Sequence, residues 1–386
     1  MTLNPKELCR RSVLAVLAAH VALPRAARSE QVDSQRPLVG ALRWDAWYAP
    51  GSTTTDALQE SLAPEKYRWR VPFFAEVQPG KMPKFPPISQ AEMDLEIRQA
   101  SFAGLDYWAF VAYGNDDSMS LALSKYLTSR NRDLVKFCLF TELSHWGTVS
   151  HPAKLISEHI ALMGRKEYVR VQDARPLYFL GFIDKKSVTE RWGSNDGLRN
   201  EIQDFRSRCV ASGAGNPFIV LAGTASEIED WSSLPGDAIG AYVVSDPRGS
   251  GSYASLTQLV ERRWQSMARH GLPVVPTVVT GWDRRPRVEH PVPWEHNQKP
   301  GEGSEFYFDA PTADQIAAHL RKAIQFASAR TDGKKAPAIL VYAWNENDEG
   351  GWLVPTSPCD TQRLEAFHSV LSTEPLSHNP KCKIIE

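Results

Sequence analysis

Short apolar runs recur along the chain and alternate with longer segments in which apolar residues repeat every three to four positions. Short runs rich in β-branched and aromatic residues are typical of strands buried on both faces, and the longer repeat is typical of amphipathic helices. The runs predict eight strands, at 38–47, 105–112, 134–140, 176–183, 218–222, 238–244, 273–279 and 338–344. The repeats predict helices at 118–129, 152–164, 197–212, 226–232, 253–270, 312–329 and 362–371. Ser89, with Glu92 three residues later, is typical of a capping box and predicts the start of one more helix.

Eight strands that alternate with helices predict a single (β/α)8 barrel of the TIM type, which we assign to residues 38–372, with a C-terminal tail at 373–386. A doubly wound open sheet is the competing architecture, but the glycine-rich phosphate turn of its dinucleotide-binding version is missing. Two proline-rich segments, 50–87 and 284–311, have no periodicity and predict long loops over the C-terminal face of the barrel.

Composition narrows the class of partner. The chain has 386 residues, 42% of them hydrophobic, and a net charge of -1, which gives no reason to expect nucleic acid or an anionic membrane as a partner. Its 12 Trp residues are unusual. Large aromatic surfaces with one polar atom suit grooves that bind sugars, although many of these residues are expected to pack in the core.

The first 29 residues have the pattern of an export signal peptide. Arg10 and Arg11 precede an apolar run at 13–23 and a small-residue segment at 26–29. The arginine pair resembles a twin-arginine signal, with an ordinary secretory signal or an uncleaved anchor as the alternatives. We therefore expect a periplasmic or secreted protein with no membrane span after signal cleavage, because no other apolar run is long enough.

The cysteines lack metal-binding or redox spacing. Cys138 and Cys209 fall in apolar segments and are expected to be unpaired, whereas Cys359 and Cys382 lie in a polar C-terminal region and could form a disulfide in an oxidising compartment.

The predicted barrel places its active site at the carboxyl ends of the strands. The last strand runs into Glu346 and Glu349, after which Gly350 and Gly351 allow the chain to curl so that both acids reach one cavity. Aromatic faces hold the C–H face of a sugar, while acids and amides bind its hydroxyl groups, so the partner expected is an oligosaccharide or polysaccharide. The candidate substrate-binding residues are Trp44, Asp45, Trp47, Tyr48, Tyr113, Glu142, His145, Trp146, Asp246, Trp282, Asp283, Arg284, Asn345 and Trp352. No metal or cofactor is expected, since no cluster has ligand spacing.

Cleavage of a glycosidic bond needs one neutral carboxyl group as proton donor and a second group that assists from the other side of the ring. Two acids close together in a semi-buried cleft repel, and this raises the pKa of one of them. We expect Glu349 to be the general acid/base and Glu346 to be its partner. For acids such as Asp45 and Asp283, a salt bridge or a helix cap is the ordinary alternative role.

The segment 344–350, with Trp352 and Pro355 after it, resembles the Asn-Glu-Trp-x-Glu-Gly signature of glycoside hydrolase family 99 (endo-α-mannosidases and endo-α-mannanases) and of the related WbsX-like proteins. Segments 44–51, 105–108 and 281–287 resemble these proteins more weakly. The resemblance implies a (β/α)8 barrel and retaining hydrolysis of α-mannosidic bonds without a metal. It also implies that Glu346 deprotonates the sugar 2-hydroxyl to form a 1,2-anhydro-sugar, with Glu349 as acid/base. Asn347 and Val354 depart from the signature.

The sequence therefore predicts an exported glycoside hydrolase that cleaves α-glycosidic bonds. A barrel that binds carbohydrate without cleaving it is the alternative from another class. A WbsX-like glycosyltransferase-related protein is a further alternative, which the export signal disfavours because sugar nucleotides are cytoplasmic.

Overall fold

The computed structural model describes residues 36–148, 151–152, 154–223, 234–329 and 334–382. The predicted signal peptide at 1–29 and the predicted helix at 226–232 lie outside the described residues.

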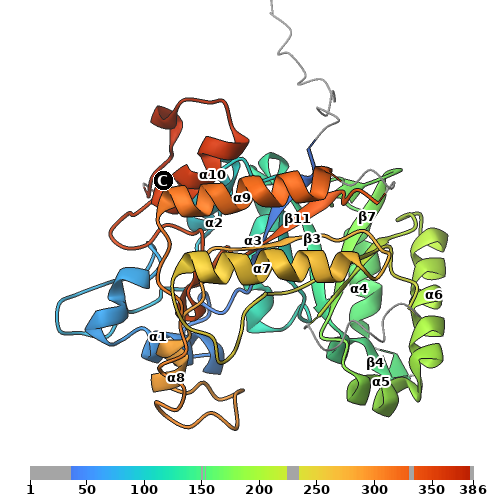
Figure 1. Cartoon of the computed structure of the whole chain (residues 1–386), viewed down its shortest axis with the longest axis horizontal. Helices are drawn as coiled ribbons and strands as arrows, with labels where there is room; N and C mark the ends of the chain where they lie inside the picture. The colour runs from blue at the N-terminus through green and yellow to red at the C-terminus, as the bar shows by residue number, and fades with distance from the viewer. Residues whose placement is uncertain (1–35, 149–150, 153, 224–233, 330–333, 383–386) are drawn as a thin grey trace, which may run out of the picture. The chain divides into compact units, whose positions relative to one another are not determined.

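The centre of the molecule is a sheet of parallel strands in the order β10-β11-β1-β2-β3-β7-β8-β9 (Figure 1). Their bounds are β1 Leu38–Arg43, β2 Tyr107–Val111, β3 Lys136–Glu142, β7 Arg175–Gly181, β8 Phe218–Ala222, β9 Ala238–Gly240, β10 Thr277–Val279 and β11 Ala338–Tyr342. Each of the eight predicted strands overlaps one of them.

The sheet closes on itself between its two end strands. Ile239 of β9 bridges Val274, just before β10, and the Ile239 amide donates to the Pro273 carbonyl at 2.8 Å. The Val275 amide donates back to the Ile239 carbonyl at 2.8 Å. This closure confirms the (β/α)8 barrel and contradicts the open doubly wound sheet. Every residue of β2, β8 and β11 is buried, as a barrel filled inside and covered outside requires.

Helices surround the barrel and follow the predicted periodicity (Figure 1). They are α2 Gln90–Phe102, α3 Leu121–Thr128, α4 Lys154–Met163, α6 Asn195–Ala211, α7 Tyr253–Ala268, α9 Ala313–Ser328 and α10 Gln362–Leu371. The Ser89 capping box is present, since the Ser89 side chain accepts from the Glu92 amide and the Glu92 side chain accepts from the Ser89 amide. On the outside, α7 and α9 pack together through stacked rings of Trp264 and His319, whose centroids are 5.2 Å apart.

Both proline-rich segments contain more structure than predicted. The 50–87 segment forms α1 (Thr53–Ser61) and a 3-10 helix, η1 (Glu65–Arg70), and the 284–311 segment begins with α8 (Arg285–Glu289). Ser52 caps α1 by accepting from the Thr55 amide, a local signal that the missing apolar period obscured. A helix at Lys185–Trp192, α5, was also not predicted.

Smaller elements complete the chain. They are η2 Ser118–Ser120, η3 Arg132–Leu134, η4 Leu143–Trp146, β4 Gly147–Thr148, β5 His151–Pro152, β6 Arg170–Val171, β12 Asn345–Glu346, η6 Asn347–Glu349, β13 Gly351–Trp352 and η7 Leu376–His378.

The thiols follow the prediction. Cys359 and Cys382 form a disulfide with a Cα–Cα distance of 5.7 Å, and Cys138 and Cys209 are buried and free. In the part of the chain that the structure describes, none of the helices combines the length and the apolarity needed to cross a membrane.

Candidate active site

The acid pair lies on a tight hairpin that follows β11. Strand β12 pairs antiparallel with β13, so that Glu346 lies opposite Gly351, and η6 makes the turn between them. Gly350 ends the turn at φ +93°, and a Cβ atom there would lie 2.5 Å from the backbone nitrogen of Asp283. Only glycine fits this conformation and this approach. The turn is how Glu346 and Glu349, three residues apart, come to face the same neighbours.

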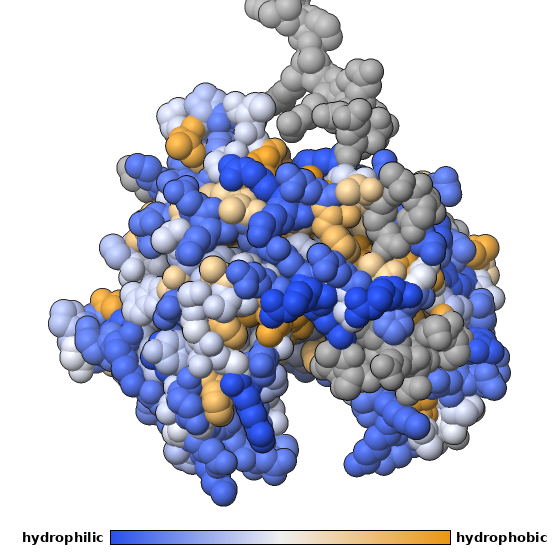
Figure 2. Space-filling model, in the orientation of Figure 1, coloured by the Kyte–Doolittle hydropathy of each residue, from blue (hydrophilic) through white to orange (hydrophobic). Residues whose placement is uncertain are grey.

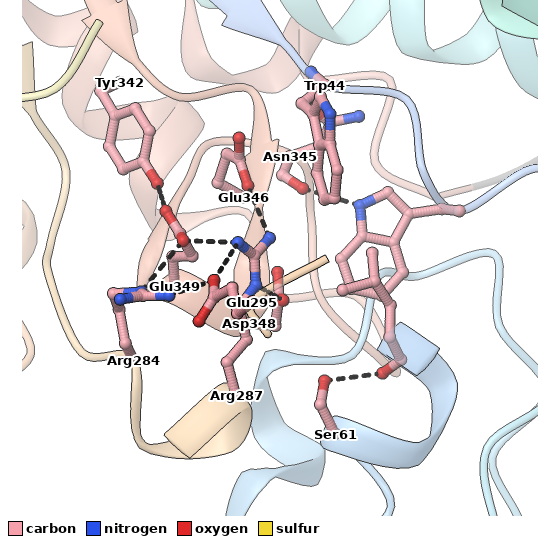
Figure 3. A network of polar contacts seen from close by, with 12 residues as sticks. Trp44, Ser61, Arg284, Arg287, Glu295, Tyr342, Asn345, Glu346, Asp348 and Glu349 are labelled. Atoms are coloured by element: carbon pink, nitrogen blue, oxygen red, sulfur yellow. Dashed lines mark hydrogen bonds and ion pairs between the residues drawn. The ribbon is translucent and has the colours of Figure 1, made fainter. Parts of the chain in front are cut away.

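A single guanidinium links the two acids. Arg287, in α8 after strand β10, donates from Nη1 to Glu349 Oε1 at 2.5 Å and from Nη2 to Glu346 Oε2 at 3.3 Å. Its Nε donates to Asp348 (Figure 3). Glu346 is only 2% exposed and Glu349 7% exposed. Three acids of one turn therefore share one buried counter-charge from the neighbouring strand end.

Glu349 is held in its ionised form. Arg284 Nε donates to Oε1 at 3.1 Å, and the Tyr342 hydroxyl donates to Oε2 (Figure 3). Burial alone would raise the pKa of the Glu349 carboxyl, but the charges of Arg287 and Arg284 together with the Tyr342 hydrogen bond outweigh burial and lower this pKa below its ordinary value.

Glu346 lies in the opposite electrostatic environment. Burial and the nearby negative charge of Glu349 raise the pKa of its carboxyl well above the ordinary value. Arg287, at 3.3 Å, and a hydrogen bond from the Tyr242 hydroxyl at 2.5 Å only partly offset that rise. Of the two carboxyl groups, Glu346 therefore has the higher pKa and the stronger tendency to hold a proton. The sequence predicted Glu349 as the general acid/base and listed Arg284 only as a substrate-binding residue, so it did not take into account the charges of Arg284 and Arg287 beside Glu349.

Aromatic side chains surround Glu346. Trp44 is half-buried, its Nε1 donates to the Tyr113 hydroxyl at 2.8 Å, and its backbone nitrogen donates to Asn345 Oδ1 at 3.0 Å. Trp294 packs edge-on against Trp44 with a centroid distance of 5.6 Å, and the Arg287 guanidinium lies 5.0 Å from the Trp44 ring centre. The predicted residues Trp44, Tyr113 and Asn345 are thus brought together beside the acid pair.

Phe182 is an aromatic residue of this region that the sequence reasoning missed. It directly follows β7, is 41% exposed, and has a φ of +54°. Its ring packs against Tyr242 at 5.3 Å, and Tyr242 in turn contacts Glu346. A bulky residue in the left-handed region costs about 1–3 kcal/mol, and such strain concentrates at functional sites. Inside an apolar run predicted as a strand, nothing in the sequence signals it.

Three predicted residues support the hairpin from beneath. Asp45 accepts from Arg43 Nε and from Asn345 Nδ2, both at 3.0 Å. Trp47 Nε1 donates to the Asn345 carbonyl at 2.7 Å, and the Tyr48 hydroxyl accepts from Arg43 at 2.9 Å. All of these side chains are buried, so their observed partners are protein groups.

Two other predicted residues, Trp146 and Asp246, have their observed partners elsewhere, whereas the His145 ring packs against Tyr113 with a centroid distance of 5.3 Å. Trp146 is buried, donates to the Tyr178 hydroxyl at 3.1 Å and packs on Phe205 in the core. Asp246 is exposed and accepts from the Arg248 amide. Glu142 accepts from the Ser144 hydroxyl at 3.1 Å, and His145 Nδ1 contacts the Ala112 carbonyl at 3.0 Å.

The remaining candidates belong to a second pocket. Trp282, Asp283 and Trp352 line a pocket of about 220 Å³, whose lining residues do not include Glu346 or Glu349. The space-filling view shows a separate hollow, between the lobe that carries α1 and α8 and the lobe that carries α5 (Figure 2). Arg287 lies in α8, and Phe182 lies three residues before the start of α5, so each side of this hollow carries an element that contains or adjoins a residue of the acid site.

The carboxylates of the site are engaged with arginines. Within the described residues, no group of three or more His, Cys, Asp or Glu side chains is arranged to hold a metal ion.

Comparison with known proteins identifies no family for this chain. No protein-family model matches it, and no curated protein matches it.

Among solved structures, the chain is similar to a GH99 endo-α-mannosidase from Bacteroides thetaiotaomicron in complex with BIS-TRIS-propane. The two share 15% identity with a TM-score of 0.49, and the match covers 86% of this chain and 95% of that chain. A second structure of that enzyme gives 13% identity and a TM-score of 0.47, with the same coverage. Xylanase A of P. fluorescens subsp. cellulosa in complex with xylopentaose gives 10% identity and a TM-score of 0.41, over 72% of this chain and 92% of that chain. Similarity at this level does not define an activity.

Proposed function

We propose that this chain is a glycoside hydrolase whose catalytic groups are Glu346 and Glu349. The observation that carries the proposal is that two buried glutamates at the carboxyl end of a barrel strand share one arginine, while the pKa of one is raised and that of the other is lowered. Environments that separate the pKa values of a carboxyl pair identify an acid and an ionised partner, which are the two roles that glycosidic cleavage requires.

The electrostatics support one division of labour. Glu346 holds the proton and donates it to the glycosidic oxygen of the leaving group. Glu349 stays ionised and stabilises the positive charge that develops at the anomeric carbon. A water molecule then adds its oxygen to that carbon and returns a proton to Glu346. Arg284, Arg287 and Tyr342 occupy both oxygens of Glu349, which suits a fixed negative charge better than a group that exchanges protons.

The family resemblance supports the reverse division, in which Glu349 donates the proton and Glu346 deprotonates the sugar 2-hydroxyl. It also supports an α-mannoside-like substrate, retention of configuration and a 1,2-anhydro-sugar intermediate. The half-buried Trp44 and Tyr113 and the exposed Phe182 supply flat apolar faces for a sugar in either case. The substrate class that these aromatic faces support is an oligosaccharide or polysaccharide, and the signal-peptide pattern of residues 1–29 supports export to the periplasm or the exterior.

The deciding experiment compares Glu346→Gln and Glu349→Gln on two substrates, a natural glycan and an aryl glycoside whose leaving group needs no proton. If Glu346 is the acid, Glu346→Gln lowers kcat on the glycan by roughly 10²–10⁴-fold but lowers it little on the activated substrate. Glu349→Gln lowers the rate on both substrates. Glu261→Gln, on the outer helix α7, is the matched control and keeps wild-type rates.

The opposite pattern, in which only Glu349→Gln is rescued by the activated leaving group, would establish the division that the resemblance implies. Full activity of both variants on the glycan would refute the proposal itself.

A barrel that binds glycans without cleaving them is the second candidate function. The low exposure of Glu346 and the full set of partners around Glu349 favour it. A panel of α- and β-glycans separates the two functions, because a binding protein would retain glycans without releasing reducing ends. Turnover of a sugar nucleotide would instead revive the glycosyltransferase alternative.

A further inference from the structure

The second pocket is lined by three arginines and by flat aromatic rings. It lies between η1, the segment that follows β10, the hairpin after β11 and the first turn of α10, and its volume is about 220 Å³. A water molecule occupies about 30 Å³ in the liquid, so the pocket has room for one ring-sized group rather than an extended chain. The side chains used in the argument are Arg70, Arg285, Arg363, Asp283, Trp352 and Tyr307.

The charges in this pocket are unbalanced. Asp283 receives Nε and Nη2 of Arg285 at 2.9 and 2.7 Å, and it is also ion-paired with Arg70, so one carboxylate serves two guanidinium groups. Arg363 donates Nη1 to the carbonyls of Thr280 and Trp352 at 2.9 and 3.1 Å. Among the described residues, no carboxylate forms an ion pair with Arg363. The other acid that lines the pocket, Asp309, is exposed.

Two of these guanidinium groups are shielded from water, Arg70 fully and Arg363 in part. Burial lowers the pKa of Arg363 to about 9, and repulsion from Arg70 also lowers it, yet the group remains a cation at neutral pH. Arg70 is 2% exposed, and its buried Nε has no hydrogen-bond partner among the described residues.

Aromatic rings fix the orientation of the guanidinium groups. The Arg363 guanidinium lies 3.5 Å from the centre of the Trp352 ring, and that of Arg285 lies 3.5 Å from the centre of the Tyr307 ring. Stacked guanidinium groups keep their planar donors pointing outward, and two donors in a plane match the two oxygens of a carboxylate.

We propose that this pocket binds the carboxylate group of a sugar unit of the uronic-acid class. The carboxylate follows from the three guanidinium groups that line the pocket and from Arg363, whose observed partners are carbonyl oxygens rather than a carboxylate. The sugar follows from the ring-sized, aromatic-lined space and rests on the proposed function. Gly350 lines the pocket and directly follows Glu349. A glycan bound at Glu346 and Glu349 therefore has, close to the cleavage site, a pocket that recognises a carboxylate group on one of its sugar units.

The test is calorimetric titration of the full chain with glucuronate, glucose and acetate. Glucuronate is expected to bind at least ten-fold more tightly than glucose and more tightly than acetate, and its affinity is expected to fall as salt is raised. Arg363→Gln should weaken glucuronate binding by at least ten-fold. Arg321→Gln, an exposed arginine on α9, is the matched control and should leave binding unchanged.

The outcomes that overturn the proposal are distinct. Equal binding of glucose and glucuronate, or no binding of either, removes the carboxylate site, and acetate binding as tightly as glucuronate removes the sugar. Arg285→Gln, at a side chain that is 30% exposed, provides a second variant if Arg363→Gln does not fold. Titration of the Glu346→Gln/Glu349→Gln double variant separates the two proposals, because the pocket should still bind glucuronate even if those acids prove to have no catalytic role.

Discussion

At the scale of single residues, the arginines next to the acids decide which acid carries the proton. Glu346 and Glu349 are the same residue type on one turn, and a sequence alone does not distinguish them electrostatically. Arg284 and Arg287 both contact Glu349, whereas Glu346 receives only the longer contact from Arg287. Three of the four residues from 284 to 287 are arginines. This cluster is the sequence signal for the missed contacts, because buried carboxylates require a counter-charge.

The hydroxyl of Tyr242 tunes the acid, and Tyr242→Phe tests how strongly. Its hydrogen bond lowers the pKa of Glu346, so its removal should raise that pKa further. If Glu346 is the proton donor, the alkaline limb of the kcat/KM profile should move to higher pH by about one to two units. A hydrogen bond to a charged group contributes about 1.5–3 kcal/mol, and each pKa unit corresponds to about 1.4 kcal/mol.

The control for Tyr242→Phe is Tyr178→Phe, which removes another buried hydroxyl that contacts Trp146 and His159 in the core. It should leave the pH profile of activity in place. An alkaline limb that moves to lower pH in Tyr242→Phe, or does not move, would contradict the assignment of the proton to Glu346.

At the scale of elements, the strands and the turn that carries Glu346 and Glu349 could be predicted from the sequence, whereas the contacts between distant segments could not. Each barrel strand is an apolar run with a local signature, and Glu346 and Glu349 were found because they directly follow one. Tyr342 and Tyr242 were hidden as ordinary members of apolar runs, and Arg287 lay in a segment with no period. Their roles depend on the register that places the ends of β9, β10 and β11 next to one another, which only the closed sheet defines.

The C-terminal disulfide makes a prediction at the same scale. It closes a loop with a sequence separation of 23, which holds the segment after α10, and Gln99 of α2 contacts the Lys381 carbonyl within that segment. Chain entropy assigns about 3 kcal/mol to a loop of this length, so Cys382→Ser should lower the free energy of unfolding by up to that amount. Urea unfolding with and without a reductant measures the effect. The reductant should destabilise the wild type and leave Cys382→Ser unchanged, and an equal response of both proteins would contradict a structural role for the bridge.

At the scale of the whole molecule, the carboxyl-terminal face of the barrel is held together by ionic contacts between neighbouring strand ends. Arg287, in the segment that follows β10, contacts the hairpin after β11. Arg70 of η1, in the 50–87 segment, contacts Asp283. These contacts fix the acid site and the arginine-lined pocket on either side of one hairpin. A glycan that spans both would be recognised by its charge at one site and cleaved at the other.

The stability of this face should therefore depend on Arg287 and on pH. Arg287→Gln leaves Asp348 buried without its counter-charge and leaves Glu349 with Arg284 alone, and breaking a buried pair costs about 3–5 kcal/mol of unfolding free energy at neutral pH. In the wild type the pKa of Glu349 is lowered, so its stabilising contribution is present above the ordinary glutamate value of about 4.3 and is lost as the pH falls through the folded-state value. In the variant that pKa should rise instead. The stability difference between the two proteins should thus be largest near pH 7 and shrink towards pH 4, as measured by urea unfolding across that range.

The control variant is Arg208→Gln, which removes a partly exposed ion pair with Asp204 on α6. It should lower the free energy of unfolding by less than about 1 kcal/mol at every pH. A constant difference between Arg287→Gln and the wild type across the range would show that the guanidinium acts through packing rather than through its charge.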